Sequence, residues 1–422
     1  VQKHSGLRIV KKVNNKPISE KSSMNKPTKK AVITVLGLVG GDDKHQKANY
    51  YFEDSTKEIQ EHYNTLTLLI GEYSKEYKIV PIYTKEAKEA NTIALNKSRV
   101  EFTYFDDIYL IKDDKDFEGV FNIINNAVSS YDELIIDVSH GFRHIPILMI
   151  VDLIIQNFQD TSKIKKILYA KEIEQFKEYE IIDLKKYLDL ANITFILTTF
   201  TQNYTVANHI KSDKYSKLVE KLNSFSNDLM ALSLNNLFKK TSQELIKELE
   251  NTVKEPELRD LANKLIEHIN NITSYKDKKR YETYYNLSRD LYDKKYILLS
   301  LSLLFESIRM YIRSSIEKNH PEIVTDIEMQ LNKDRYKIGD FFKNLAWKGY
   351  EDLSKISISE SNYKVLQKSY DGLNISNLYN SIDKTRNNLA HANSDNKTFK
   401  DIEHEVGELL NKYYEKCIKQ NP

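Results

Sequence analysis

The first 185 residues alternate between short apolar runs and helical patterns, and this alternation strongly constrains the fold. Strand-like runs occupy residues 31–39, 78–84, 99–104, 133–138, 164–169 and 179–182. Helical patterns lie between them, at residues 56–76 and 116–128 and in the apolar run from Ile145 to Ile155. Strands that alternate with helices predict an α/β domain with a doubly wound, mostly parallel sheet, whose ligands bind at the carboxyl ends of the strands.

From about residue 186 the spacing of apolar residues becomes helical and strand patterns almost disappear. The second half is therefore predicted to be all-α, with a long amphipathic segment at 283–316 and a final segment at 376–395. Residues 1–29 lack an apolar core pattern and are expected to be a disordered tail or, before Met24, an artificial extension. The predicted divisions are 1–29 as this tail, 30–185 as the α/β domain, 186–275 as connecting helices and 276–422 as a helical domain.

Composition narrows the classes of function. The 63 Lys and Arg residues nearly balance the 61 Asp and Glu residues, so any nucleic-acid site must be local. One cysteine, Cys417, allows no internal disulfide and fits a reducing compartment. No apolar run is long enough to cross a bilayer and no secretory signal precedes the first strand, so we expect a soluble, cytoplasmic protein without a membrane partner.

The junction at residues 137–146 (DVSHGFRHIP) joins a buried strand directly to an apolar helix. A helix start offers free backbone N–H groups to an anion, and Gly141 allows the backbone to approach a ligand closely. Ser139, His140, Arg143 and His144 add polar side chains. The junction predicts a phosphate-binding turn, although an ordinary turn with a hydrogen-bonded histidine explains the same residues about equally well.

A second polar group lies near the C-terminus, in residues 383–392 (DKTRNNLAHA). Arg386 can hold a phosphate and the imidazole of His391 can move protons, which suffices for RNA cleavage by the ribose 2′-hydroxyl without a metal. Five residues on one helix separate side chains by about 140°, so this pair would converge with the same pair of a second subunit. Asn387 is placed to orient the imidazole or to contact phosphate. Arg313 and His320 form a rival pair with a similar spacing. On spacing alone, a structural role explains Arg386 and His391 somewhat better than a catalytic one.

Four motifs together resemble those of a known family. In chain order they are Leu36-Gly37-Leu38, Tyr83-Thr84-Lys85-Glu86-Ala87, the junction at 137–146, and Arg386 to His391. This order resembles that of the CRISPR-associated CARF–HEPN ribonucleases of the type III ancillary group. Ser139 stands where threonine is more usual, which keeps the hydroxyl. The resemblance implies a Rossmann-like CARF domain followed by an all-α HEPN domain.

The resemblance also implies an activity. It implies a homodimer, with or without further assembly, that binds a cyclic oligoadenylate and then cleaves single-stranded RNA nonspecifically as a metal-independent endoribonuclease of antiviral defence. Cyclic tetra-adenylate (cA4) is favoured over cyclic hexa-adenylate (cA6) as the activator, and no cofactor or metal is needed. The implied catalytic residues are Arg386, Asn387 and His391, and the implied messenger-binding residues are Gly37, Leu38, Thr84, Ser139, His140, Gly141 and Arg143.

Two alternatives remain open at this point. The chain could be a sensor or transcriptional regulator that binds the messenger without cleaving RNA, or it could also degrade its own messenger. The absence of a G-x-G-x-x-G fingerprint or a P-loop argues against a dinucleotide oxidoreductase or an NTPase. Glu306, on the segment at 283–316, is a weaker candidate because a single glutamate on an amphipathic helix is usually only solvated.

Overall fold

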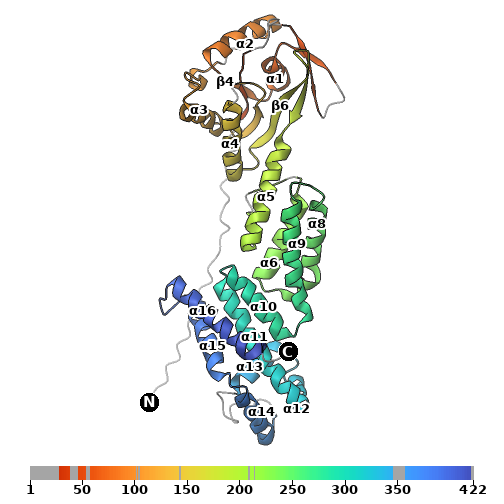
Figure 1. The fold of residues 1–422 in the computed structure, drawn as a ribbon, viewed down its shortest axis with the longest axis vertical. Helices are drawn as coiled ribbons and strands as arrows, with labels where there is room; N and C mark the ends of the chain where they lie inside the picture. The colour runs from red at the N-terminus through yellow and green to blue at the C-terminus, as the bar shows by residue number, and fades with distance from the viewer. Residues whose placement is uncertain are drawn as a thin grey trace, which may run out of the picture. The chain divides into compact units, whose positions relative to one another are not determined.

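The computed structural model describes residues 28–38, 46–53, 58–100, 102, 105–141, 144–207, 210–212, 214–345 and 357–419. The chain divides into two compact units between Leu188 and Asp189, called here the α/β unit and the helical unit. All described strands belong to the first, and the described part of the second is helical (Figure 1). The prediction of a sheet domain followed by a helical region is confirmed.

One mixed sheet forms the framework of the α/β unit. Its described strands follow the order β3 (Gln60–His62), β2 (Ala48–Phe52), β7 (Glu178–Asp183), β6 (Ile164–Glu174), β5 (Glu133–Asp137), β1 (Lys30–Val35) and β4 (Lys78–Ile82). β1 pairs in parallel with β4 and β5, and β5 pairs in parallel with β6. β7 is antiparallel to β6, β2 is parallel to β7, and β3 is antiparallel to β2. The sheet therefore has a parallel centre, and the carboxyl ends of β4, β1 and β5 share one edge.

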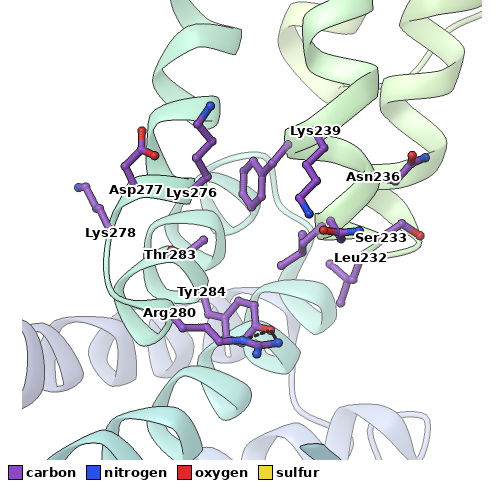
Figure 2. Close-up of a pocket in the computed structure, with 13 residues that line it drawn as sticks. Leu232, Ser233, Asn236, Lys239, Lys276, Asp277, Lys278, Arg280, Thr283 and Tyr284 are labelled. Atoms are coloured by element: carbon purple, nitrogen blue, oxygen red, sulfur yellow. Dashed lines mark hydrogen bonds between the residues drawn. The ribbon is translucent and has the colours of Figure 1, made fainter.

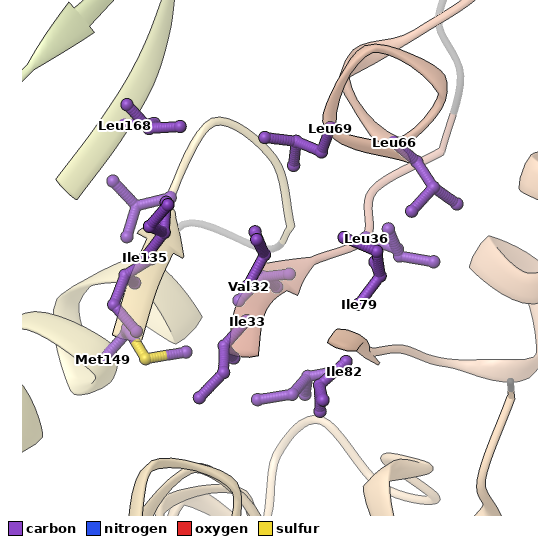
Figure 3. Packing of buried hydrophobic residues seen from close by; sticks show 14 of the residues in the cluster. Val32, Ile33, Leu36, Leu66, Leu69, Ile79, Ile82, Ile135, Met149 and Leu168 are labelled. Atoms are coloured by element: carbon purple, nitrogen blue, oxygen red, sulfur yellow. The ribbon is translucent and has the colours of Figure 1, made fainter. Parts of the chain in front are cut away.

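Helices pack on both faces of this centre. They are α1 (Thr65–Tyr73), α2 (Lys85–Ser98), α3 (Phe117–Ser129) and α4 (His144–Gln159). α1 contacts α2, and α3 contacts α4. Successive residues of a strand point to opposite faces, and in Figure 3 Val32 of β1 points towards Leu69 of α1 while Ile33 points to the side of Met149 of α4. β1 is accordingly apolar on both faces, as a strand covered by two helical layers must be.

Two expectations for the α/β unit were wrong. The strand predicted at 99–104 does not appear among the described residues of that range, because Arg99 ends α2 in the left-handed conformation at φ 53°. A short 3₁₀ turn, η1 (Asp107–Tyr109), follows instead. The segment predicted as helical at 56–76 contains β3 before α1 begins, and β2 had not been assigned to a strand. β3 is the edge strand and β2 lies next to it, and both are too short to show a long apolar run.

The helical unit is built mainly from α-helices. Their bounds are α5 (Lys185–Asn203, which spans the division between the units), α6 (Ser216–Met230), α7 (Leu234–Asn236), α8 (Ser242–Thr252), α9 (Arg259–Ser274), α10 (Arg280–Asp293), α11 (Ile297–Asn319), α12 (Pro321–Gln330), α13 (Arg335–Asn344), α14 (Glu360–Gly372), α15 (Ser376–Ala390) and α16 (Phe399–Tyr413). Shorter turns are η2 (Leu237–Thr241, a π-helical turn), η3 (Tyr275–Asp277) and η5 (Tyr414–Ile418).

The long segments predicted from periodicity are shorter in the structure. The segment at 283–316 is two helices, α10 and α11, which pack against each other and are separated at Lys295, where φ is 66°. The hydroxyl of Ser288 in α10 donates to the backbone oxygen of Ser300 in α11 at 2.7 Å, which fixes this helix pair. The final segment at 376–395 ends as a helix at Ala390. Within the described residues, no helix combines the length and apolarity that crossing a membrane would require.

Candidate functional site

The loops that follow β1 and β5 touch each other at the carboxyl edge of the sheet. A methyl group on Gly37 would lie 3.0 Å from the backbone nitrogen of Gly141 and 3.1 Å from Cβ of His140. Gly141 has φ +104°, and a methyl group there would lie 2.5 Å from Cγ1 of Val35. Gly141 therefore requires glycine, and a side chain on Gly37 would force its neighbours to shift by a few tenths of an ångström. The structure brings together Gly37, His140 and Gly141, three of the residues singled out in the sequence.

A buried pair of asparagines links the loop after β1 to α2, the helix that follows β4. The side-chain amide of Asn91, in α2, donates to the backbone oxygen of Gly37 at 3.0 Å. Its side-chain oxygen accepts from the amide of Asn64 at 2.7 Å, and Asn64 caps α1 through a reciprocal bond pair with Thr67. Sequence reasoning missed Asn91 and Asn64. Their only local signal was an asparagine inside a helical pattern and one before a helix start.

Ser139 is held by bonds within the protein. Its hydroxyl donates to the buried carboxylate of Asp137 and accepts from the backbone N–H of Ala170 at 2.8 Å. The other carboxylate oxygen of Asp137 accepts from the hydroxyl of Thr34, in β1, at 2.6 Å. Ser139 thereby ties the end of β5 to β6, so in this structure it positions the turn.

The remaining predicted ligand residues at this edge differ in their availability. Burial lowers the pKa of His140, against the opposing effect of the Asp137 carboxylate, so the imidazole is neutral at pH 7 and can both donate and accept a hydrogen bond. The hydroxyl of Thr84 caps α2 by accepting from the N–H of Ala87 at 3.2 Å. Leu38 is 63% exposed. Arg143 lies outside the described residues.

The late polar motif lies at the end of α15 in the helical unit. Arg386 is half-buried and donates to the side-chain oxygen of Asn387 at 2.9 Å, and the amide of Asn387 donates to Asp383 at 3.3 Å. His391 is the exposed residue that ends the helix. Its side chain and that of Arg386 form no hydrogen bond with each other. The side chain of Asn387 thus supports the arginine and not the imidazole.

Arg386 also lies against a buried aromatic ring on α11. Its guanidinium carbon is 5.3 Å from the ring centroid of Phe305, and the guanidinium carbon of Arg309 is 5.4 Å from the same centroid. Arg309 is 3% exposed and donates to Glu306 at 2.7 Å. A methyl group on Gly339 would lie 2.5 Å from Nη2 of Arg309, so this glycine leaves room for the guanidinium. Arg386 and Arg309, the latter paired with Glu306, thus contact the same aromatic ring.

A buried asparagine shapes the backbone that follows His391. Asn388 accepts two bonds on its side-chain oxygen, from the hydroxyl of Ser394 and from the N–H of Asp395, both at 2.9 Å. Its amide donates to the side chain of Asn393 at 3.2 Å. No sequence pattern pointed to Asn388, because its partners lie in a turn that only the structure defines.

The rival pair is engaged in ion pairing and packing. Arg313 donates to both carboxylate oxygens of Glu317, at 2.9 and 3.1 Å, and pairs with Glu328. His320 bonds the hydroxyl of Ser369 at 2.9 Å. A guanidinium already held by two carboxylates is poorly suited to take up a substrate phosphate. Across the described ranges, no group of three or more His, Cys, Asp or Glu side chains is placed to hold a metal ion.

Comparison with known proteins gives one relative in sequence. The chain is 24% identical over 318 residues to the CRISPR-associated protein MJ1674 of Methanocaldococcus jannaschii, an alignment that covers 71% of this chain and 48% of the relative. The chain thus spans about half the length of the curated relative it matches. No protein-family model matches the chain. This chain is therefore similar, over most of its length, to a CRISPR-associated protein.

Comparison with solved structures includes Enterococcus italicus Csm6 bound to cyclic hexa-2′-fluoro-hexa-dAMP. The alignment covers 93% of this chain and 96% of that one, at 11% sequence identity and a TM-score of 0.35. A TM-score of this size does not establish a shared fold.

Proposed function

We propose that the protein is a type III CRISPR ancillary endoribonuclease that cyclic oligoadenylate activates. The observation that carries the proposal is the convergence of Gly37, His140 and Gly141 at the carboxyl edge of a parallel sheet, in a chain whose second unit is helical and carries Arg386 and His391. Similarity to a CRISPR-associated protein supports the biological setting. The α/β unit would be the CARF sensor, and the helical unit would contain the HEPN ribonuclease.

The sheet edge suits a ligand made of phosphates and adenines. Gly37 and Gly141 would let a ligand approach the backbone closely, and the neutral His140 can donate to an adenine or phosphate. The N–H groups at the start of α4 would add donors for a phosphate. Arg143, in the same junction, would add a cation. Asn91 and Ser139 would keep the loops in place through the bonds described above. This assigns recognition to backbone and neutral groups, with the charged contacts left to few residues.

An apolar stripe on α4 supports a homodimer. Ile147, Val151 and Ile155 are 63%, 45% and 45% exposed and follow one another every four residues, on one face of the helix. The opposite face carries the buried Met149 and Leu153, which pack in the core. A second copy that covered the stripe would place two sheet-edge sites close to one axis, as a ring-shaped messenger requires.

The proposed chemistry needs no resident metal. The ribose 2′-oxygen attacks the adjacent phosphorus, the bond from phosphorus to the 5′-oxygen breaks, and the products are a 2′,3′-cyclic phosphate and a 5′-hydroxyl. Arg386 would hold the phosphate and stabilise its charge, and Asn387 would fix the guanidinium. His391 would move the protons: in a cleft of two copies, one imidazole would take the proton of the 2′-hydroxyl and the other would give a proton to the departing 5′-oxygen. The exposure of His391 and the lack of a bond to Arg386 within one chain suit a cleft made from two copies.

The proposal is tested with purified protein, labelled single-stranded RNA, and cA4 or cA6. Cleavage should appear only with a messenger, and Arg386→Ala or His391→Ala should lower its rate by about 100- to 10,000-fold while messenger binding persists. His404→Ala, which removes an exposed histidine of α16, is the matched control and should keep full activity. Messenger binding without any cleavage by the unaltered protein would favour the sensor alternative, and full activity in both site variants would refute the catalytic assignment.

A further inference from the structure

A groove of about 800 Å³ lies between two segments of the helical unit, away from the residues discussed above. One wall comes from residues 232–239, at the π-helical turn η2, and the other from residues 276–284, around the start of α10 (Figure 2). Its volume is in the range of ligand-binding clefts. π-Helical turns are uncommon and occur often at functional sites, and Leu232 beside it adopts φ 54°, a conformation unusual for a branched residue.

The lining carries a surplus of positive charge. Lys239, Lys276, Lys278 and Arg280 face the solvent around the groove, and Asp277 is the one carboxylate in the lining. The formal surplus of three positive charges exceeds the net charge of +2 on the whole chain. In Figure 2, Lys239 and Arg280 point towards the space between the walls, and Lys276 lies on the rim.

These cations lack acidic partners within the described part of the chain. Arg280 bonds only the hydroxyl of Tyr284, at 2.8 and 3.0 Å, and lies over its ring. Lys278 lies 5.5 Å from the ring centroid of Tyr275. Lys239 and Lys276 have no ion pair with a described residue. The groove therefore holds four cations that form no ion pair with a described residue.

The position of the cations relative to α10 strengthens the case for an anion. α10 begins at Arg280 without a side-chain cap, so its first N–H groups and the positive end of its dipole lie where Lys278 and Arg280 gather. Like charges at a helix N-terminus are unfavourable, and Glu282 is the one acidic residue of the first turn. An anion bound here would offset the repulsion among the cations and would also accept hydrogen bonds from the first N–H groups of α10.

Arg280 connects this groove to a second hollow of about 440 Å³, which Lys279 and Lys333 also line. Two adjoining basic hollows suit a polymer with repeated charges better than a single small anion. We propose that the groove binds the phosphodiester backbone of single-stranded RNA, an inference that rests on the proposed ribonuclease function. It assigns a role in holding substrate to residues 232–239, a part of the chain in which the sequence showed no motif.

The test measures RNA binding in the Arg386→Ala/His391→Ala background, so that the RNA is not cleaved. Labelled single-stranded RNA is titrated at several salt concentrations, with Lys239→Gln/Lys276→Gln/Arg280→Gln compared with Lys217→Gln/Lys247→Gln/Lys264→Gln. The second set removes the same charge from exposed lysines of α6, α8 and α9. The groove variant should bind roughly tenfold more weakly or worse and lose about 2 from the slope of log affinity against log salt, whereas the control should not.

The outcomes separate this inference from the proposed function. Equal losses in the two triple variants, an unchanged salt slope, or no RNA binding by the parent would overturn the groove assignment. If the groove variant bound cA4 more weakly than the parent but bound linear RNA equally well, the groove would be a messenger site. That result would also overturn the RNA assignment. A third outcome is possible: RNA binding depends on the groove, but the protein with intact Arg386 and His391 does not cleave RNA. That outcome would support the groove as an RNA-binding site and refute the ribonuclease proposal. If the triple variant of the groove unfolds, the single variant Lys239→Gln replaces it. Its slope of log affinity against log salt should change by about 0.7.

Discussion

At the sheet edge, Gly141 is constrained both by its backbone conformation and by the side chain that packs against it. Its φ of +104° is strained for any residue with a side chain, and Val35 occupies the place that a side chain would take. Val35 belongs to β1, whose position is fixed by parallel pairing on both sides. The neighbour therefore cannot move aside without disturbing the centre of the sheet.

Replacing this glycine should affect both stability and binding. We expect Gly141→Ala to lower the free energy of unfolding by about 1–3 kcal/mol and to raise the messenger concentration needed for activation. Gly372→Ala is the control, because a methyl group at that position of α14 meets no atom within 4 Å. The control should be neutral or gain about 0.5–1 kcal/mol. Urea unfolding measures both, and equal stability of the two variants would argue against the close approach of the loops.

The sequence predicted single residues well where a local pattern defined them. The strand, turn and helix around Gly141 could be predicted, because each depends on residues adjacent in the chain. The contact of Arg386 with Phe305 could not, since these residues lie on different helices and only packing brings them together. For the same reason the bonds of the Ser139 hydroxyl to Asp137 and Ala170 could not be predicted, and Ser139 as a messenger-binding residue stays a prediction.

At the scale of the element, α10 contains a carboxylate in an unfavourable place. Burial raises the pKa of Asp290 to about 6, although the hydroxyl of Tyr275 and the cations Lys294 and Arg289 oppose this. One oxygen of Asp290 is buried without a hydrogen-bond partner among the described residues. A native-state pKa above the unfolded value means that the native state binds more protons between pH about 4 and 6. The ionised carboxylate therefore costs stability above pH 6.

Removing this charge should stabilise the protein in a pH-dependent way. We expect Asp290→Asn to raise the free energy of unfolding by on the order of 2 kcal/mol at pH 8, and the gain should disappear as the pH falls through 6 towards 4. Glu267→Gln, at an exposed position of α9, is the control and should show no such trend. Thermal unfolding across this pH range measures the difference. A gain for Asp290→Asn that did not change with pH would point to packing in place of charge.

Element boundaries show where periodicity stops being informative. Apolar spacing runs through residues 283–316 without interruption, because both α10 and α11 bury a face in the same core. The turn at Lys295 carries no glycine or proline, so the chain gives no local sign of it. The parallel strands were predictable for the opposite reason, because burial on two faces makes them continuous apolar runs. The short strand β3, at the edge, and its neighbour β2 have no such run.

At the scale of the whole molecule, the proposal separates sensing and cleavage into different units. Messenger binding in the α/β unit must then change the free energy of an arrangement in the helical unit, which is a coupling between two sites. A ligand shared by two copies can favour one arrangement of the pair. A cleft built from two copies would have a testable consequence for dimers in which only one of the two subunits is altered.

Mixed dimers should reveal whether each copy cuts alone. One unaltered subunit is paired with an Arg386→Ala/His391→Ala subunit by differential tagging, and cleavage is measured at saturating messenger. If both copies build one cleft, the mixed dimer should lose well over half of the activity of the unaltered dimer. Retention of half would show that the copies act independently. A dimer mixed with a His404→Ala subunit controls for tagging and reassembly.

The apolar stripe on α4 has a consequence for how the protein would respond to its own abundance. Water contact with exposed apolar surface costs about 25 cal/mol per Å², so pairing of two stripes removes that cost but obeys mass action. Dilute chains would be mostly single, with their clefts incomplete, and each additional chain would raise the share of all chains that are paired. Output would then grow faster than the amount of protein. The three residues Ile147, Val151 and Ile155 would in this way set a threshold of expression below which even abundant messenger produces little cleavage.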